Sequence, residues 1–213
     1  MAKVNDSLLQ NLSGKVDGLV ICHLGDTVFL RKLPREKKDP KSEKQVVQRS
    51  KLSGARTMYR TLNGTMLKEI CCVAARENER LSGYLWFLHK NMKVFGADNY
   101  IDYSRLELTG GRQQQVFGME MTGFDGQRVR LKWMDNSGSM TAQSTDRLMV
   151  AAIFDDEPYT PVILPGVQGI RRDGYGLVNL PEGDWREAHL YCFFGTDSGK
   201  SYSPSMYFKV SKL

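Results

Sequence analysis

Residues 195–201 come closer to a phosphate-binding motif than any other segment of this chain. They read Gly-Thr-Asp-Ser-Gly-Lys-Ser. The phosphate-cradling pattern Gly-x-x-x-x-Gly-Lys-Ser would need a glycine where this sequence has Phe194, and it would need a following helix whose N-terminus points at the phosphates. The segment instead separates two predicted strands, so we expect a hairpin turn and no nucleotide site.

The histidines and carboxylates do not form a recognisable catalytic set. His23, His89 and His189 are far apart in the sequence, and no Gly-x-Ser-x-Gly elbow accompanies them. The run at residues 155–157, Asp-Asp-Glu, could supply oxygen ligands to calcium, but Pro158 follows it and the regular ligand spacing of a calcium loop is missing. We expect satisfied or exposed histidines, a solvated acidic loop and a chain that is not an enzyme.

The cysteines are scattered through the sequence and lack the spacing of a metal or redox site. No Cys-x-x-Cys occurs, and an adjacent disulfide at residues 71 and 72 would need a strained peptide geometry. We expect reduced and mostly buried thiols, and no metal or organic cofactor. The four cysteines are Cys22, Cys71, Cys72 and Cys192.

Positive charge is concentrated near the N-terminus. The net charge of the chain is +6, and residues 31–60 alone hold 11 lysines and arginines against three acidic residues. Three interpretations are open: a solvated loop and helix face, contact with nucleic acid phosphates, or docking in an acidic groove of a protein partner. We favour the protein partner or self-assembly, with sequence-independent nucleic-acid binding through residues 31–60 as the alternative. The predicted contact residues are Arg31, Lys32, Arg35, Lys37, Lys38 and Lys41.

The N-terminal half predicts a β-hairpin followed by two helices. Residues 16–24 and 27–30 are strand-like on either side of a Gly-Asp turn, and residues 35–39 read as an exposed basic loop. A capping box at Ser42 starts a helix with apolar residues at spacings of three and four through Ile70, although Gly54 and Gly64 could kink or divide it. A turn near residues 77–79 precedes a second stripe, formed by Leu81, Leu85, Leu88, Met92 and Phe95.

The C-terminal half changes to alternating and short apolar segments. Turn clusters such as Asp125-Gly126 separate them, which is typical of an antiparallel sandwich of immunoglobulin or fibronectin type. Trp133 and Trp185 are expected to be core anchors. The predicted strands cover residues 113–121, 128–134, 147–154, part of 169–180, 188–194 and 205–210.

Several short segments together resemble an uncharacterised family of bacterial proteins. The N-terminal ones are Ser-Gly-Lys-Val-Asp-Gly at residues 13–18 and Arg-Lys-Leu-Pro at 31–34, and the C-terminal one is His-Leu-Tyr-Cys-Phe-Phe at 189–194. Asp17 departs from the glycine that is more usual there. The resemblance covers nearly the whole chain and implies an architecture, but no activity and no catalytic residues.

These observations together predict an α+β protein. A basic hairpin and helical region, residues 1–100, should precede a β-sandwich domain, residues 101–213, with a composition ordinary for a globular protein at 41% hydrophobic and 25% charged residues. The N-terminus lacks the apolar region of a signal peptide, so we expect a cytoplasmic bacterial protein or part of an assembly formed there. The expected function is that of a non-catalytic structural or interaction protein, for example in a phage or mobile-element assembly.

Overall fold

The computed structural model describes residues 2–4, 12–25, 27–33, 41–97 and 99–212. The chain forms two compact units, Met1–Ser42 and Glu43–Leu213. The structure therefore divides the chain at residue 42, some distance from the boundary near residue 100 that the change of periodicity suggested. No helix among the described residues is long and apolar enough to span a membrane.

The described residues of the first unit form an antiparallel sheet of four strands in the order β1-β4-β3-β2. The expected hairpin is present as β3 (Leu19–Leu24) and β4 (Thr27–Lys32), while β1 (Ala2–Val4) and β2 (Gly14–Val16) add the two edges. A second tight turn divides the segment that we expected to be one strand. Asp17 and Gly18 both have positive φ, 41° and 76°, as a two-residue type I′ hairpin requires.

The second unit begins with three helices. The helix predicted from residue 42 begins at Glu43 but is divided into α1 (Glu43–Thr61) and α2 (Met66–Glu77), because Gly64 turns the chain with a φ of 76°. The predicted turn follows α2, and α3 (Gly83–Asn91) begins after the Ser82 cap.

Seven strands follow the helices and form two antiparallel sheets. One has the order β11-β10-β7-β8 and the other the order β5-β6-β9. The predicted strands are confirmed within a few residues, and the short β8 was not predicted. Their bounds are β5 (Phe117–Phe124), β6 (Arg128–Met134), β7 (Arg147–Phe154), β8 (Val162–Ile163), β9 (Tyr175–Asn179), β10 (Glu187–Gly195) and β11 (Met206–Ser211).

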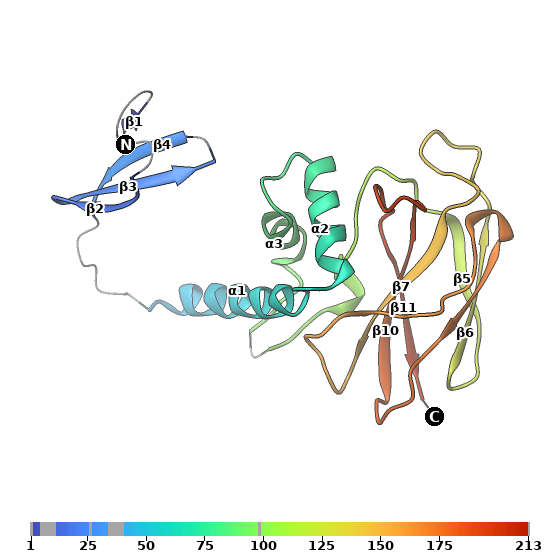
Figure 1. Ribbon diagram of the computed structural model, residues 1–213. Helices are drawn as coiled ribbons and strands as arrows, with labels where there is room; N and C mark the ends of the chain where they lie inside the picture. Colours follow the sequence, from blue (N-terminus) through green and yellow to red (C-terminus); the bar gives the residue numbers. More distant parts are fainter. Residues whose placement is uncertain (1, 5–11, 26, 34–40, 98, 213) are drawn as a thin grey trace. The chain divides into compact units, whose positions relative to one another are not determined.

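The helices share a core with the β-sheet, and this is why the unit does not divide near residue 100. On β7 and β10, alternate side chains such as Ile153, Tyr191 and Phe193 pack against the helices, while their neighbours Cys192 and Phe194 pack against the other sheet. The result is a mixed α+β unit of three layers with sandwich-like sheets. Figure 1 shows the helices on one side of β7 and β10, and β5 and β6 on the other.

The apolar stripe predicted along α3 faces the core only in part, where Leu88 and Met92 pack against it and Phe95 is buried. Leu81 and Leu85 are 81% and 44% exposed, whereas Trp86 and Phe87 are buried. Gly83 sets the orientation, because a Cβ there would lie 3.1 Å from the backbone of Cys71 and Cys72 in α2. This close approach turns the Trp86 side of the helix inward.

Candidate functional site

Three of the six predicted contact residues lie in the described part of the first unit. Arg31 and Lys32 end β4 opposite Val20 and Leu19, and as consecutive strand residues they point to opposite faces of the sheet. Lys41 lies two residues before α1 with a φ of 45°. Arg35, Lys37 and Lys38 lie outside the described residues. The described residues therefore do not gather the six on one surface.

The basic segment continues along α1, where it becomes an ordered row of arginines. Ala55 and Met58 are buried in the core. Arg49, Arg56 and Arg60 are exposed and follow one another at spacings of seven and four. At 3.6 residues per turn they lie on one side of the helix, roughly 150° away from the buried side and about 16 Å from end to end. The spacing of these three arginines was visible in the sequence. The predicted contact residues, however, all lie before α1, between residues 31 and 41.

The N-terminal half of α1 carries apolar side chains that the second unit does not bury. Val46, Val47 and Leu52 are exposed, and the two buried residues of the helix both follow residue 52. Figure 1 shows this half of α1 extending beyond α2 and α3, away from the sheets. A helix that is anchored at one end, and that carries arginines and apolar side chains along the rest, is suited to contact with another molecule.

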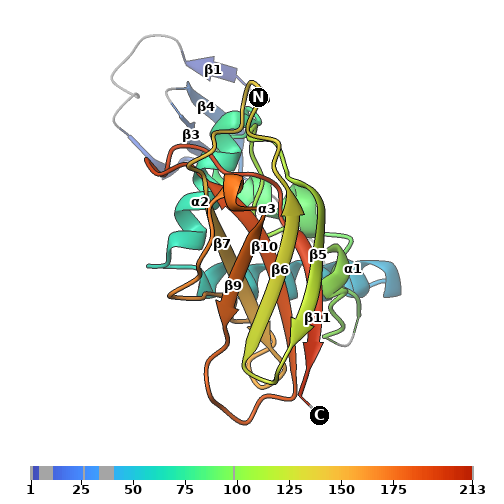
Figure 2. The ribbon, with the colours of Figure 1, turned by 90° about the vertical axis from the view of Figure 1, so that its right-hand side faces the viewer.

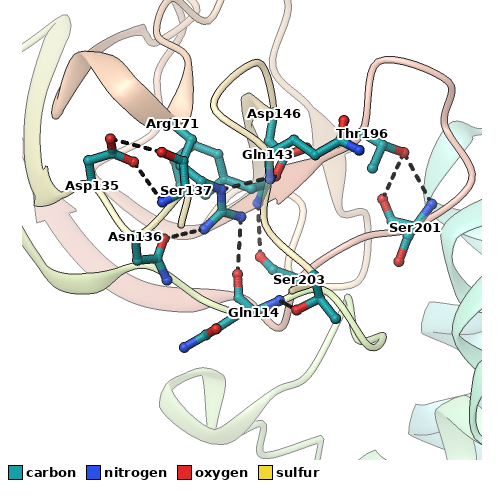
Figure 3. Close-up of polar contacts among 12 residues, drawn as sticks. Gln114, Asp135, Asn136, Ser137, Gln143, Asp146, Arg171, Thr196, Ser201 and Ser203 are labelled. Atoms are coloured by element: carbon teal, nitrogen blue, oxygen red, sulfur yellow. Dashed lines mark hydrogen bonds and ion pairs between the residues drawn. The ribbon is translucent and has the colours of Figure 1, made fainter. Parts of the chain in front are cut away.

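A fully buried ion pair lies at one end of the sandwich, as Figure 3 shows. Arg171 donates from Nε to Asp146 Oδ2 at 3.0 Å, and both side chains are at most 1% exposed. The guanidinium also donates from Nη1 to Asn136 Oδ1 at 2.6 Å and from Nη2 to the Gln114 carbonyl at 3.0 Å. Its Cζ lies 4.7 Å from the centre of the Phe194 ring. This cluster was not predicted, because one arginine in a strand-rich sequence looks like a surface residue.

The contacts of Arg171 make it a structural clamp. Burial lowers the pKa of its guanidinium, and the Asp146 carboxylate opposes that shift. The Arg171 carbonyl accepts a hydrogen bond from Trp133 Nε1 at 2.8 Å, which confirms Trp133 as a core anchor. Asp146 Oδ2 also accepts the backbone N–H of Gln143 at 2.8 Å. The ion pair therefore fixes the loop between β6 and β7 against the end of the core.

His189 is enclosed by two tyrosines. Its ring stacks on Tyr103 with centroids 3.9 Å apart, and its Nδ1 lies 2.8 Å from the Tyr207 hydroxyl. Burial lowers the pKa of this imidazole, and the Lys209 ammonium lowers it further. Burial also raises the pKa of Tyr103 to about 12. This histidine is a satisfied core side chain, one of the two outcomes expected for it.

The predicted hairpin at residues 195–201 is confirmed, and it packs against α2. Thr196 Oγ1 accepts the backbone N–H groups of Lys200 and Ser201, which closes the turn, and Ser201 donates to Glu77 Oε1 at 2.8 Å. A hollow of about 680 Å³ lies between this turn and α2. Its charged lining is mixed, with Lys68, Arg76 and Lys200 beside Glu69.

The remaining candidate groups form no reactive cluster in the described ranges. No three histidines, cysteines or carboxylates among the described residues are placed to hold a metal ion. All four cysteines are free, Cys71 and Cys192 are buried, and burial raises the pKa of the Cys71 thiol to about 12. The carboxylate of Asp155 accepts the backbone N–H of Arg186 at 2.9 Å within an exposed turn.

Comparison with known families decides the relationship of this chain. The model described as "Family of unknown function (DUF6266)" matches residues 11–209. The chain belongs to this family. No curated protein matches it. A solution structure of the fibronectin type-III domain of human fibronectin type III domain containing protein 3 is 13% identical, with a TM-score of 0.35, over 49% of this chain and 91% of that one.

Membership of DUF6266 applies to both structural units. The matched residues start before β2 and end within β11, so they include the basic segment, α1 and both sheets. The expected relationship to an uncharacterised family is thereby confirmed. The basic segment is part of the family's common region and not an extension attached to it.

Proposed function

We propose that this chain is a non-catalytic interaction protein that docks on an acidic surface of a protein partner through residues 31–60. The observation that carries the proposal is the outer side of α1. Arg56 and Arg60 are exposed one turn apart on a helix that is fixed to the second unit by Ala55 and Met58. Each guanidinium can form paired hydrogen bonds with a carboxylate of the partner. Because the helix is already ordered, binding does not cost the conformational entropy that ordering a loop would cost.

The exposed apolar residues of α1 favour protein over nucleic acid as the partner. Val46, Val47 and Leu52 lie on the same helix as the arginines and are exposed. Apolar side chains contribute to a protein interface, whereas a contact with phosphates uses only the cations and polar groups. Sequence-independent nucleic-acid binding through the same segment is the alternative, supported by the row of arginines.

The packing of potentially reactive groups supports a non-catalytic role. His189 is enclosed by Tyr103 and Tyr207, the ion pair of Arg171 is fully buried, and the Cys71 thiol is held protonated. The proposal also assigns the two sheets of the second unit to a sandwich of immunoglobulin or fibronectin type. It further places the protein in an assembly formed in the bacterial cytoplasm, such as a phage particle or another mobile-element machine.

The test is isolation of the full chain from its native cells with and without nuclease, followed by binding measurements with the purified partner. The variant Arg56→Glu/Arg60→Glu reverses two charges of the row, and Arg172→Glu/Arg186→Glu reverses two exposed arginines elsewhere. We expect a nuclease-resistant partner whose affinity falls at least tenfold for the first variant and stays unchanged for the second.

Two results would contradict the proposed function. Loss of every partner on nuclease treatment, with equal sensitivity of DNA binding to Arg56→Glu/Arg60→Glu, would establish the nucleic-acid alternative. Equal losses for the two reversed pairs would show that only net charge matters and that α1 is not the docking element.

A further inference from the structure

The sheet of β5, β6 and β9 has one face in the core, and its opposite face is exposed in the part of the second unit that the structure describes. Figure 2 looks directly at this sheet, with β6 between β5 and β9. Along β6 the burial alternates without a break: Val129, Leu131 and Trp133 point into the core, and the residues between them are exposed. We call the exposed side the outer face. It carries Phe117 and Glu120 from β5, Arg128, Arg130, Lys132 and Met134 from β6, and Tyr175 and Leu177 from β9.

Large aromatic and apolar side chains gather at one end of the outer face. Phe117 lies opposite Met134, and Tyr175 lies opposite Lys132, which is two residues before Met134. Tyr175 is 69% exposed, Met134 62% and Phe117 55%. Two exposed rings on the two strands that flank β6 provide flat apolar surfaces on which other planar groups can stack.

The rest of the outer face is a row of cations on the central strand. Arg128, Arg130 and Lys132 follow one another at every second position, which places them about 7 Å apart. Arg130 is 3.9 Å from Asp125, whose carboxylate already accepts the backbone N–H groups of Gln127 and Arg128. Arg128 and Lys132 form no ion pair with another residue in the described part of the chain.

The opposing charge on the outer face is small. Glu120 is the one carboxylate among its members, and it lies opposite Lys132. Three cations against Glu120 and the neighbouring Asp125 leave this face slightly positive, although residues 61–213 carry a net charge of −1. The positive charge is therefore local to the sheet and not a general property of the second unit.

We propose that the outer face binds single-stranded nucleic acid. Bases stack on Tyr175 and Phe117, and the phosphates of the same strand follow the cations of β6. Stacking platforms beside a positive track are the combination by which proteins hold single strands without reading their sequence. A duplex fits less well, because its bases are already stacked and this sheet presents no helix or ribbon to a groove.

This proposal is independent of docking through α1. The outer face belongs to β5, β6 and β9, whereas the arginine row belongs to α1, and they share no residue. A chain with both surfaces could hold a single strand and a protein partner together. Failure at one surface leaves the other testable.

The test measures the fluorescence anisotropy of a labelled oligothymidylate, and of a duplex of equal length, with the full chain at several salt concentrations. Three phosphate contacts predict a slope near −2 for the logarithm of affinity against the logarithm of salt, from about −0.7 for each contact. Loss of one stacking ring in Tyr175→Ala should weaken binding roughly 5- to 150-fold. Tyr175→Phe should retain the affinity, since it retains the ring.

Charge variants and controls separate the possible outcomes. Arg130→Gln/Lys132→Gln should weaken binding and reduce the salt slope, while Arg172→Gln should change neither. Because these side chains are exposed, each variant should melt as the natural chain does, which is checked first. The proposal is overturned if the oligothymidylate does not bind at low salt, if the duplex binds equally well, or if Arg56→Glu/Arg60→Glu abolishes binding while Tyr175→Ala does not. It is also overturned if Tyr175→Ala instead disrupts a dimer or a protein complex, which would make the outer face a protein interface.

Discussion

Replacing Arg171 by methionine should destabilise the second unit strongly. Methionine keeps much of the length of the side chain but removes every donor, so the Asp146 carboxylate stays buried without its cation. Asn136 Oδ1 and the Gln114 carbonyl lose their donors as well. Breaking one side of a buried ion pair costs about 3–5 kcal/mol. For a unit of this size that is a fall of roughly 6–20 °C in melting temperature.

The chain contains a matched control for this experiment. Arg147 and Asp197 also form an arginine–aspartate pair, with Nε and Oδ1 2.8 Å apart, but their side chains are 68% and 69% exposed. Solvent screens this pair, so Arg147→Met should cost less than about 1 kcal/mol. The comparison holds the residue types of the ion pair constant, while the two pairs differ in burial and in the further hydrogen bonds that Arg171 makes.

A double variant shows whether the cost of Arg171→Met arises from the orphaned carboxylate. In Arg171→Met/Asp146→Leu no charge is left buried, so the double variant should be more stable than Arg171→Met alone. Urea unfolding followed by tryptophan fluorescence is a suitable assay, because Trp86, Trp133 and Trp185 all lie in the second unit. The reasoning is refuted if Arg171→Met costs no more than Arg147→Met, or if the two changes at the buried pair simply add.

Four further predictions concern the core, the thiols and the absence of a structural metal. A fragment of residues 101–213 should lack cooperative melting, whereas residues 43–213 should melt cooperatively, because the helices cover one side of β7 and β10; circular dichroism checks both. Gly111→Ala should lower the melting temperature by several degrees, since its Cβ would lie 2.4 Å from the Tyr202 carbonyl, and the same change at the open position Gly138 should not. A thiol reagent at neutral pH should modify two cysteines quickly and two only on unfolding, as mass spectrometry would show; the slow pair is Cys71 and Cys192. Dialysis against a strong chelator should leave the melting temperature unchanged.

The sequence predicted the strands well where alternation and turns agreed. β6 and β7 have the predicted bounds, because turn residues flank the alternating pattern of β6 and the continuous apolar segment of β7. The buried side of α3 was predicted only in part, since the leucine stripe and the Trp86–Phe87 side have similar helical periodicity. Only the approach of Gly83 to α2 chooses between them, and that contact depends on residues far away in the sequence.

The organisation of the core was harder to predict than its elements. A change from helical to strand periodicity marks a change in the type of element, and we had interpreted it as a change of domain. The apolar segment Leu-Met-Val-Ala-Ala-Ile-Phe at 148–154 contained the missing information, because a strand without polar alternation is covered on both sides. The two candidate surfaces were hard to predict for a similar reason. The sequence shows the cations of α1 and β6, but only the packing shows which of them share an exposed side of the helix or sheet.

The core that the helices share with β7 and β10 determines how long their apolar sides stay exposed during translation. The helices leave the ribosome about a hundred residues before β10, whose Tyr191 and Phe193 complete their core. At 5–20 residues per second the apolar sides of α2 and α3 wait roughly 5–20 s for that strand. Nascent chains that have reached only β6 should therefore be the species most exposed to chaperones and proteases, and slowing translation within residues 135–190 should lengthen that exposure.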